Sequence, residues 1–513
     1  MLAKVISSAT LGVDAYAVQV EADIQQQLPA FVTVGLPEGA VRESKERVTA
    51  AIKNSDFLFP SKRVTINLAP ADIKKEGSAF DLPIAVGILS ATGQILRDRC
   101  DDFVMLGELS LDGTLRPVPG VLPMALSFKG CNEGLKGLIV PRENAKEAAM
   151  ADSLPVFAVE SLKEAVHFLE DESNLRPFTI DIESAFRDAH HYTADFSDVK
   201  GQESAKRALE VAAAGGHNII MIGPPGSGKT MLARRMPTIL PALSLEEALE
   251  TTKIHSVAGH LPTGSALVAT RPFRSPHHSI SYAGLIGGGA IPKPGEVSLA
   301  HHGVLFLDEL PEFKKDILEM LRQPMEDGQV TISRAATTLS YPAGFMLVSA
   351  MNPCPCGYYG DSNHDCNCST SEIQRYMSRI SGPLMDRIDI HITVPAVKFK
   401  ELSSNSSGEK SNLIRDRVNH ARERQLDRFT HEKEFFCNAH MESQTIRKYC
   451  KIDQKSSSLL STAITSQGLS ARAYDRILKV ARTIADLADS AEIQLGHIAE
   501  AIHYRTLDRK LWM

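Results

Sequence analysis

The sequence predicts an α/β protein in which a parallel sheet wrapped by helices lies between further domains. The first observation is length, because 513 residues are too many for a single hydrophobic core. The second is the apolar run Asn218 to Ile222, which has the length of one buried strand and leads into a glycine-rich turn. The third is a similar run, Val304 to Leu307, which ends in two acidic residues. We therefore expect the site chemistry at the carboxyl ends of these strands.

The glycine-rich turn is the strongest motif of the chain. Residues 223–230 read GPPGSGKT and match the spacing of a phosphate-binding loop, G-x-x-x-x-G-K-T. Its glycines let the backbone turn N–H groups toward phosphate oxygens, and the helix that follows adds the partial positive charge of its N-terminus. Lys229 is predicted to reach the β- and γ-phosphates of ATP, and Thr230 to ligate Mg²⁺. The loop residues predicted to contact the nucleotide are Gly223, Pro224, Pro225, Gly226, Ser227, Gly228, Lys229 and Thr230.

The second apolar strand supplies the acidic partners that a phosphate loop needs. Asp308 is predicted to hold Mg²⁺ through its water shell, and Glu309 to polarise the attacking water as a general base. Many buried strands end in acids, so this signal gains its weight from its position downstream of the phosphate loop. Together the two elements predict an ATPase that uses ATP and Mg²⁺.

Composition limits the classes of function that remain. Hydrophobic residues make up 43% of the chain and charged residues 23%, which is typical of globular proteins. The net charge is −6, so any surface that binds nucleic acid has to be a local cluster of basic residues. The sequence shows neither a signal peptide nor an apolar run of membrane-spanning length, and four of its 8 cysteines are isolated. We therefore expect a cytoplasmic protein that makes no contact with a membrane.

The first 170 residues alternate strand-like and helix-like segments. Three stretches among them are KKEGSAFDLPIAVGIL (Lys74 to Leu89), GELSLDGTLRPVPGV (Gly107 to Val121) and PRENAKEA (Pro141 to Ala148). These stretches resemble the proteolytic domain of Lon-type proteases, an α+β domain that uses a Ser–Lys dyad. The position that matches the nucleophile is Ala79 and the position that matches the base is Leu122, with Ser78 one place away. The resemblance therefore implies an inactive domain used for assembly or partner binding.

The middle of the chain resembles AAA+ ATPases. Asp195 to Gln202, DFSDVKGQ, is similar to the segment that packs on adenine in that family, which makes Val199 and Gly201 neighbours of the nucleotide. The same segment is also consistent with a plain N-cap, Ser197 or Asp198, for the following helix.

Three polar residues match the AAA+ positions that sense the γ-phosphate. Asn352 follows an apolar strand and matches the sensor between the two acids and the phosphate. Arg387 matches an arginine finger that reaches the ATP of a neighbouring subunit, although a surface ion pair with a nearby aspartate is the alternative. Arg472, on the polar face of an amphipathic helix, matches the second-sensor arginine of the helical lid. Arg379 and Arg482 are the second choices for these two roles.

Taken together, these elements resemble the Mg-chelatase-like branch of AAA+ ATPases, and in particular its ComM type. The type is indicated by the Lon-like domain, by RSPHHS (Arg274 to Ser279) and by NPCPCG (Asn352 to Gly357). The resemblance implies homo-hexameric rings that move along single-stranded or branched DNA and drive branch migration in natural transformation and homologous recombination, with recombination proteins as partners. The alternative is a remodelling or metal-chelatase motor that acts on a protein.

Two stretches have the character of DNA-gripping loops. Gly284 to Pro294 is a glycine-rich insertion with the cation Lys293, and Gln329 to Leu339 reads as a hairpin with Arg334 near its tip. Such cations bind phosphate without reading bases. Arg334 could instead bind a carboxylate or a neighbouring subunit's ATP. The pair of histidines at 277–278 is consistent either with a DNA contact or with simple packing.

Four cysteines cluster as C-x-C-x₉-C-x-C, a pattern that indicates a structural Zn²⁺ site. The polar intervening loop cannot pack by itself, so that a metal would supply its fold. Disulfides, free thiols, and His364 in place of one thiolate are the alternatives. The predicted ligands are Cys354, Cys356, Cys366 and Cys368.

These features predict the domain boundaries. The lid follows a serine-rich stretch, Ser403 to Ser411. The predicted parts are an inactive Lon-like domain at 1–170, a linker at 171–193, an AAA+ core at 194–398 with a cysteine-rich insert at 354–368, and a helical lid at 399–513.

Overall fold

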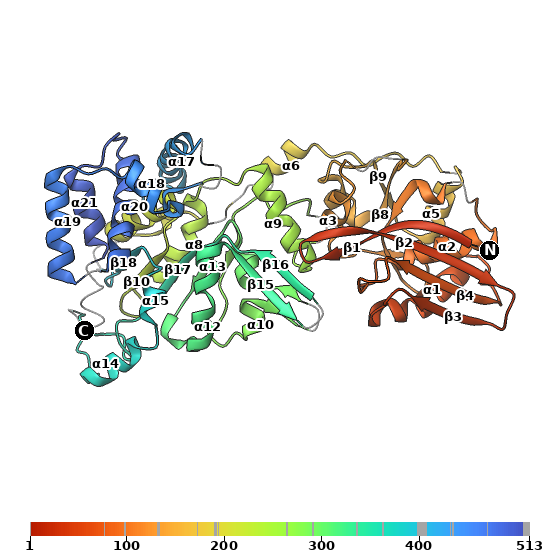
Figure 1. Cartoon of the computed structure of the whole chain (residues 1–513), viewed down its shortest axis with the longest axis horizontal. Helices are drawn as coiled ribbons and strands as arrows, with labels where there is room; N and C mark the ends of the chain where they lie inside the picture. The colour runs from red at the N-terminus through yellow and green to blue at the C-terminus, as the bar shows by residue number, and fades with distance from the viewer. Residues whose placement is uncertain are drawn as a thin grey trace. The chain divides into compact units, whose positions relative to one another are not determined.

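The chain divides into two compact units in the computed structural model (Figure 1). The first unit comprises Met1–His190 and Leu245–Ala269, and the second comprises His191–Ser244 and Thr270–Met513. The structure describes residues 2–505 except 76, 97–98, 131–133, 172, 189–191, 193, 263–264, 290–291, 335–336, 362–363, 398–407, 431, 433–435 and 469. The predicted start of the lid and most of the serine-rich stretch lie outside the described residues.

The first unit contains a mixed seven-stranded sheet in the order β3-β4-β2-β1-β5-β8-β9. Its two long central strands pair antiparallel, whereas β5, β8 and β9 continue the sheet in parallel from β1. Helix α2 (Asp81–Thr92) is buried from Asp81 to Ala91, as its nearly continuous apolar sequence predicts. The strands are β1 (Leu2–Leu11), β2 (Asp14–Gln25), β3 (Ala30–Val34), β4 (Arg63–Ala69), β5 (Phe103–Met105), β8 (Gly137–Pro141) and β9 (Val156–Val159).

A segment from the middle of the chain belongs to this first unit, which the sequence did not indicate. It begins with helix α9 (Leu245–Val257). The hydroxyl of Ser256 on α9 donates to the carboxylate of Glu147, and the Gly120 N–H donates to the same hydroxyl at 2.9 Å. Burial raises the pKa of Glu147, while the hydrogen bonds from Ser256 and from the Leu122 N–H favour its charged form. A buried polar network therefore holds α9 within this unit.

The second unit is built on a parallel five-stranded sheet in the order β11-β14-β17-β10-β18, which confirms the predicted α/β architecture. The three central strands are buried along their whole length, as expected for a parallel sheet covered on both faces. The strands are β10 (Ile219–Ile222), β11 (Phe273–Arg274), β14 (Val304–Leu307), β17 (Met346–Met351) and β18 (Ile390–Thr393).

Helices complete the second unit and include a C-terminal helical layer. Helix α20 places Ile477, Val480 and Ile484 in the core, as its apolar stripe predicts, and Ser470 caps its N-terminus by accepting from the Ala473 N–H. Within the described part of the chain, no helix has the length and apolarity needed to cross a membrane. The main helices are α7 (Glu203–Gly215), α8 (Lys229–Ile239), α17 (Ser411–Arg428), α18 (Ser443–Tyr449), α19 (Gln454–Gln467), α20 (Ala471–Leu487) and α21 (Leu495–His503).

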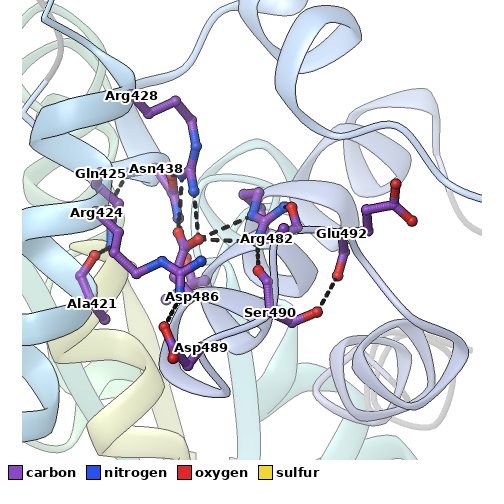
Figure 2. A network of polar contacts seen from close by, with 12 residues as sticks. Ala421, Arg424, Gln425, Arg428, Asn438, Arg482, Asp486, Asp489, Ser490 and Glu492 are labelled. Atoms are coloured by element: carbon purple, nitrogen blue, oxygen red, sulfur yellow. Dashed lines mark hydrogen bonds and ion pairs between the residues drawn. The ribbon is translucent and has the colours of Figure 1, made fainter.

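A fully buried carboxylate, Asp486 on α20, ties the C-terminal helices together (Figure 2). The guanidinium groups of Arg428 on α17 and of Arg482 both donate to it, and the Asn438 amide adds a bond of 2.9 Å. Arg482 also donates to the carbonyl oxygens of Ser490 and Ala491, at 2.7 and 2.8 Å. Arg482, the second choice for the lid sensor, is therefore committed to the helical core.

We predict that Asp486→Ala lowers the stability of the second unit by about 3–5 kcal/mol, because it leaves two buried guanidinium groups without their carboxylate. The matched control is Asp489→Asn, which removes the exposed partner of Arg424 and should cost about 0–1 kcal/mol. Chemical denaturation followed by circular dichroism measures both changes. Equal midpoints for the two variants would contradict the role of the buried network.

Candidate active site

The phosphate loop connects β10 to α8 at the carboxyl edge of the sheet. Gly226 and Gly228 have φ of 74° and 88°, values that L-residues with a side chain rarely adopt. A Cβ at Gly223 would lie 2.0 Å from the Val394 carbonyl oxygen, so only glycine fits beside the end of β18. Helix α8 begins at Lys229, immediately after the loop, so that its free N–H groups face the loop.

The side chain of Lys229 lies inside the loop. Its ammonium donates to the carbonyl oxygens of Gly223 and Pro224, at 2.7 and 2.8 Å, and lies 3.3 Å from Asn352 Oδ1. Burial lowers the pKa of Lys229, and the nearby carboxylate of Asp308 opposes that change. The predicted phosphate-binding lysine and the predicted sensor are therefore neighbours, although 123 residues separate them.

The acids at the end of β14 lie beside the start of α8. Thr230 Oγ1 donates to Asp308 Oδ2 at 2.7 Å, so that the two predicted Mg²⁺ ligands are in contact. Asp308 Oδ1 accepts from the Glu309 N–H at 3.0 Å, and Glu309 itself has a left-handed backbone with φ of 52°. A hydroxyl and a carboxylate oxygen in contact beside a phosphate loop fit the hard-oxygen preference of Mg²⁺.

The segment predicted to lie near adenine also touches the loop. Val199 is fully buried and Gly201 has φ of 64°. The next residue, Gln202, donates to the carbonyl oxygens of Ser227 and Pro395, at 3.3 and 2.6 Å. Gln202, which was not singled out for this role, is the N-cap residue of α7 and makes no side-chain cap bond.

A helix cap next to this segment differs from the alternative drawn from the sequence. The expected caps, Ser197 and Asp198, are not at the start of α7. Asp195 instead caps a short 3₁₀ turn at 196–198 and accepts from the Ser197 N–H at 2.8 Å. Asp195 lies two residues before Ser197 and three before Asp198, because the 3₁₀ turn that it caps precedes α7.

The four clustered cysteines lie close together on a loop that follows Asn352. The Sγ atom of Cys354 lies 3.3 Å from that of Cys356 and 3.7 Å from that of Cys366, and Cys368 Sγ accepts from the Cys356 N–H at 3.4 Å. Four sulfurs at about 2.3 Å from a tetrahedral zinc would lie about 3.8 Å apart, whereas a disulfide needs about 2.05 Å. The donor set therefore fits zinc and is too widely spaced for disulfides.

Two contacts define the surroundings of this cysteine loop. A Cβ at Gly357 would lie 2.7 Å from Pro225 Cδ, so the loop packs directly on the phosphate loop. His364, the alternative ligand, stacks on Tyr358 and lies 3.6 Å from an Asp361 oxygen. Among the residues described, the ligand group here consists of the four cysteines.

Arg387 and Arg472 line one cavity of about 550 Å³, together with the cations Arg476 and Lys479. No residue of the phosphate loop lines it. Arg387 pairs with Glu326 and donates to the Pro383 carbonyl oxygen at 2.7 Å, but its buried Nε has no hydrogen-bond partner in the described structure.

Arg472 is held less firmly than Arg387. Arg472 is two-thirds exposed and lies 3.9 Å from Asp386, a loose contact in solvent. Arg379, the second choice for the finger, pairs with Glu312 and the Pro311 carbonyl oxygen. The sharing of one cavity by Arg387 and Arg472 was not predicted from the sequence.

The two loops predicted to grip DNA lie against each other. The hairpin forms between β15 (Gln329–Arg334) and β16 (Thr337–Pro342), and its tip at 335–336 lies outside the described residues. A Cβ at Gly288 in the glycine-rich insertion would lie 3.2 Å from Arg334 Nη2, and Tyr341 on the hairpin donates to the Pro292 carbonyl oxygen at 2.6 Å. Lys293 and Arg334 are both exposed.

In the first unit, the positions that match the protease dyad carry no reactive group. Ala79 and Leu122 are buried. Ser78, one place away, donates to the Glu108 carboxylate rather than to a lysine. A serine held by a carboxylate lacks the dyad partner.

The comparisons with known proteins agree with this geometry. The family models "Magnesium chelatase, subunit ChlI", "Subunit ChlI of Mg-chelatase" and "Magnesium chelatase, subunit ChlI C-terminal" match residues 195–402, 20–144 and 408–505. The chain is 45% identical to Uncharacterized protein YifB of Salmonella typhimurium and 44% identical to Competence protein ComM of Haemophilus influenzae. Both alignments cover 99% of this chain and 98% of the relative. Lon protease 2 of Bacillus subtilis is 34% identical over 154 residues, 27% of this chain and 26% of that protein.

The fold, the phosphate loop and the matches to family models identify this protein as a phosphate-loop ATPase of the AAA+ class. The chain belongs to the Mg-chelatase-like family of AAA+ proteins and, within it, to the ComM type. The resemblance inferred from the sequence is thereby confirmed. Membership implies ATPase activity with ATP and Mg²⁺ as its ligands.

We predict that Glu309→Gln binds ATP but hydrolyses it about 10²–10⁴-fold more slowly, because the amide cannot accept the proton of the attacking water. Lys229→Ala should weaken ATP binding itself. Binding of a fluorescent ATP analogue and release of phosphate measure the two steps separately. Glu312→Gln, the same change at a carboxylate paired with Arg379, is the control and should retain hydrolysis. Undiminished turnover by Glu309→Gln would contradict its role as the base.

Proposed function

We propose that this protein is an ATP-driven, ring-forming DNA motor, a helicase or branch-migration translocase that acts in natural transformation and homologous recombination. The observation that carries the proposal is its similarity, over almost the full length of both chains, to a protein named Competence protein ComM. The structure adds support, because the exposed cations Lys293 and Arg334 lie on two loops in contact with each other. Cations on adjacent loops offer a strand of DNA phosphates a sequence-tolerant grip.

At the nucleotide site, each residue has a role in hydrolysis. Lys229 would hold the β- and γ-phosphates, and Thr230 with Asp308 would hold Mg²⁺, which would neutralise charge on the phosphates. Glu309 accepts the proton of the attacking water, and Asn352 senses the γ-phosphate from beside Lys229.

The cavity that holds Arg387 and Arg472 supports the proposal of a ring. Cations that lie in a cavity without phosphate-loop residues cannot complete their own subunit's site from there, but they can complete a neighbour's. Arg387 already has one buried donor unpaired, and exchange of Glu326 for a phosphate would place a planar cation where charge develops in the transition state. We propose a homo-hexamer in which both arginines act on the adjacent subunit's ATP.

The cysteine loop is proposed to hold a structural Zn²⁺ through Cys354, Cys356, Cys366 and Cys368. Because this loop packs on Pro225 and follows Asn352, a closed metal site would stiffen one wall of the nucleotide site.

The Lon-like domain is proposed to be inactive as a protease and to serve assembly or partner binding.

We predict that single-stranded or branched DNA raises the rate of ATP hydrolysis. Lys293→Ala with Arg334→Ala should remove most of this increase and reduce the slope of log affinity against log salt by about 1 per residue. Lys451→Ala, at an exposed lysine of the helical layer, is the control and should keep the increase. Stimulation by a protein substrate and none by DNA would favour the remodelling or chelatase-type motor instead.

We predict that Arg387→Ala and Lys229→Ala, each deficient in hydrolysis alone, partly restore it when mixed. A mixed ring contains interfaces at which an intact phosphate loop faces an intact arginine. Phosphate release from mixtures of varied ratio gives the measurement, and the same experiment with Arg379→Ala tests the second choice. Absence of rescue while both variants still assemble would count against an arginine that acts between subunits.

We predict about one zinc per chain in purified protein by elemental analysis. Cys366→Ser combined with Cys368→Ser should remove it, because two thiolates cannot close a four-sulfur site. Cys100→Ala, at a buried cysteine of the first unit, should leave the metal content unchanged. Metal-free protein that stays folded with full ATPase activity would exclude a structural role for zinc.

A further inference from the structure

The two loops proposed to grip DNA meet at one residue of the glycine-rich insertion, Gly288. The short antiparallel ladder within the insertion sets Gly288 opposite Lys293. A Cβ at Gly288 would lie 3.2 Å from Arg334 Nη2 on the hairpin and 3.6 Å from the Cβ of Ala283. The lack of a side chain at this position therefore lets the guanidinium of Arg334 approach the backbone beside Lys293. Two exposed cations from different loops are thus gathered around one glycine.

An exposed aromatic side chain lies next to this junction. Tyr282 immediately precedes Ala283 and begins the short helix α10 (Tyr282–Leu285) (Figure 1). The N-cap residue Ser281 accepts from the Gly284 N–H at 3.1 Å, and this bond fixes the backbone at the start of the helix. Tyr282 is nevertheless 46% exposed, whereas the last residue of the same helix is fully buried. The helix therefore presents an open aromatic ring from a fixed backbone position.

An open ring beside two cations has the chemistry of a single-strand binding site. Every base has an aromatic face, so a tyrosine ring stacks on any base and gives binding that tolerates all sequences. The cations beside the ring attract the phosphates of the same strand. A base reaches the ring only when it has left the stack of a duplex, and unstacking a paired base costs free energy. The combination of ring and cations therefore favours single-stranded over duplex DNA.

We propose that Tyr282, Lys293 and Arg334 form a subsite for single-stranded DNA, in which the phenol ring stacks on a base and the two cations bind the neighbouring phosphates. This inference rests on the proposed function as a DNA motor and names the form of DNA that its loops accept. The two parts of the subsite differ in their dependence on salt. Binding of phosphates by cations releases counterions, whereas stacking of a neutral ring does not. The contribution of Tyr282 to affinity therefore persists at high salt.

Fluorescence tests the contact between ring and base directly in the full-length protein. The chain contains one tryptophan, Trp512, so Trp512→Phe gives a background without an indole and Tyr282→Trp then adds a single reporter. Stacking on a base should quench the emission of this indole when a single-stranded thymidine oligonucleotide is added. A blunt duplex of the same length should quench it less. An unquenched indole in protein that has bound the oligonucleotide overturns the stacking contact.

Affinity measurements test what the contact contributes. Tyr282→Ala should weaken the binding of a single-stranded oligonucleotide about tenfold, leave the slope of log affinity against log salt unchanged, and leave the affinity for a blunt duplex unchanged. Tyr282→Phe keeps the ring and should bind as the wild type does, whereas Tyr282→Leu keeps apolar volume without a ring and should resemble Tyr282→Ala. Fluorescence anisotropy of labelled DNA at several salt concentrations gives these values.

The matched control is Tyr474→Ala, which removes an exposed tyrosine from helix α20 and should leave DNA binding unchanged. Thermal unfolding and ATP binding establish that each variant is folded. Equal losses of single-stranded and duplex binding in Tyr282→Ala, or a reduced salt slope, would show that the ring only supports the loops and would overturn the subsite. Wild-type protein that binds neither form of DNA contradicts the DNA motor, whereas normal binding by both the wild type and Tyr282→Ala contradicts the subsite alone.

Discussion

The site depends on the parallel register of β10, β14 and β17. Parallel strands place their carboxyl ends on one edge of the sheet, so the phosphate loop, the acids and Asn352 emerge side by side. The hydrogen bond from Thr230 to Asp308 and the contact from Lys229 to Asn352 are direct results. A strand that ran the other way would carry its polar residues to the opposite edge.

The flanking strands extend this arrangement in two directions. On one side, β11 continues in step with β14 and brings His278 to Glu309. On the other side, Asp389 lies just before β18 and is paired with Arg476 on α20. The Asp389 carboxylate also accepts from the Asn218 N–H at 3.1 Å, immediately before β10. One buried carboxylate, that of Asp389, therefore links the C-terminal helices to the start of strand β10.

The first unit is linked to the nucleotide site by chain connectivity. The segment Leu245–Ala269 follows the phosphate-loop helix and precedes β11, yet it packs within the first unit, so the chain passes between units after residues 190, 244 and 269. The buried Glu147 and Ser256 hold this segment in place. The segment Leu245–Ala269 is thus a part of the first unit whose two ends are covalently joined to the unit that carries the nucleotide site.

The sequence by itself determined the features that depend on local spacing. Residues 223–230 contain the glycines, the lysine and the threonine of the phosphate loop within one short stretch. This local spacing is enough to specify the loop and to predict the strand before it and the helix after it. The spacing of the four cysteines likewise indicated a shared site, whose sulfur atoms the structure brings together. The apolar pattern of α20 predicted its buried face.

Only the tertiary structure decided which distant residues meet. The contact of His278 with Glu309 depends on β11 being the neighbour of β14, and the common cavity of Arg387 and Arg472 depends on how α20 docks beside the end of the sheet. The placement of α9 in the first unit depends on a buried network with Glu147. Such pairings are set by strand order and by packing between faces far apart in the chain, which no local pattern of residues specifies.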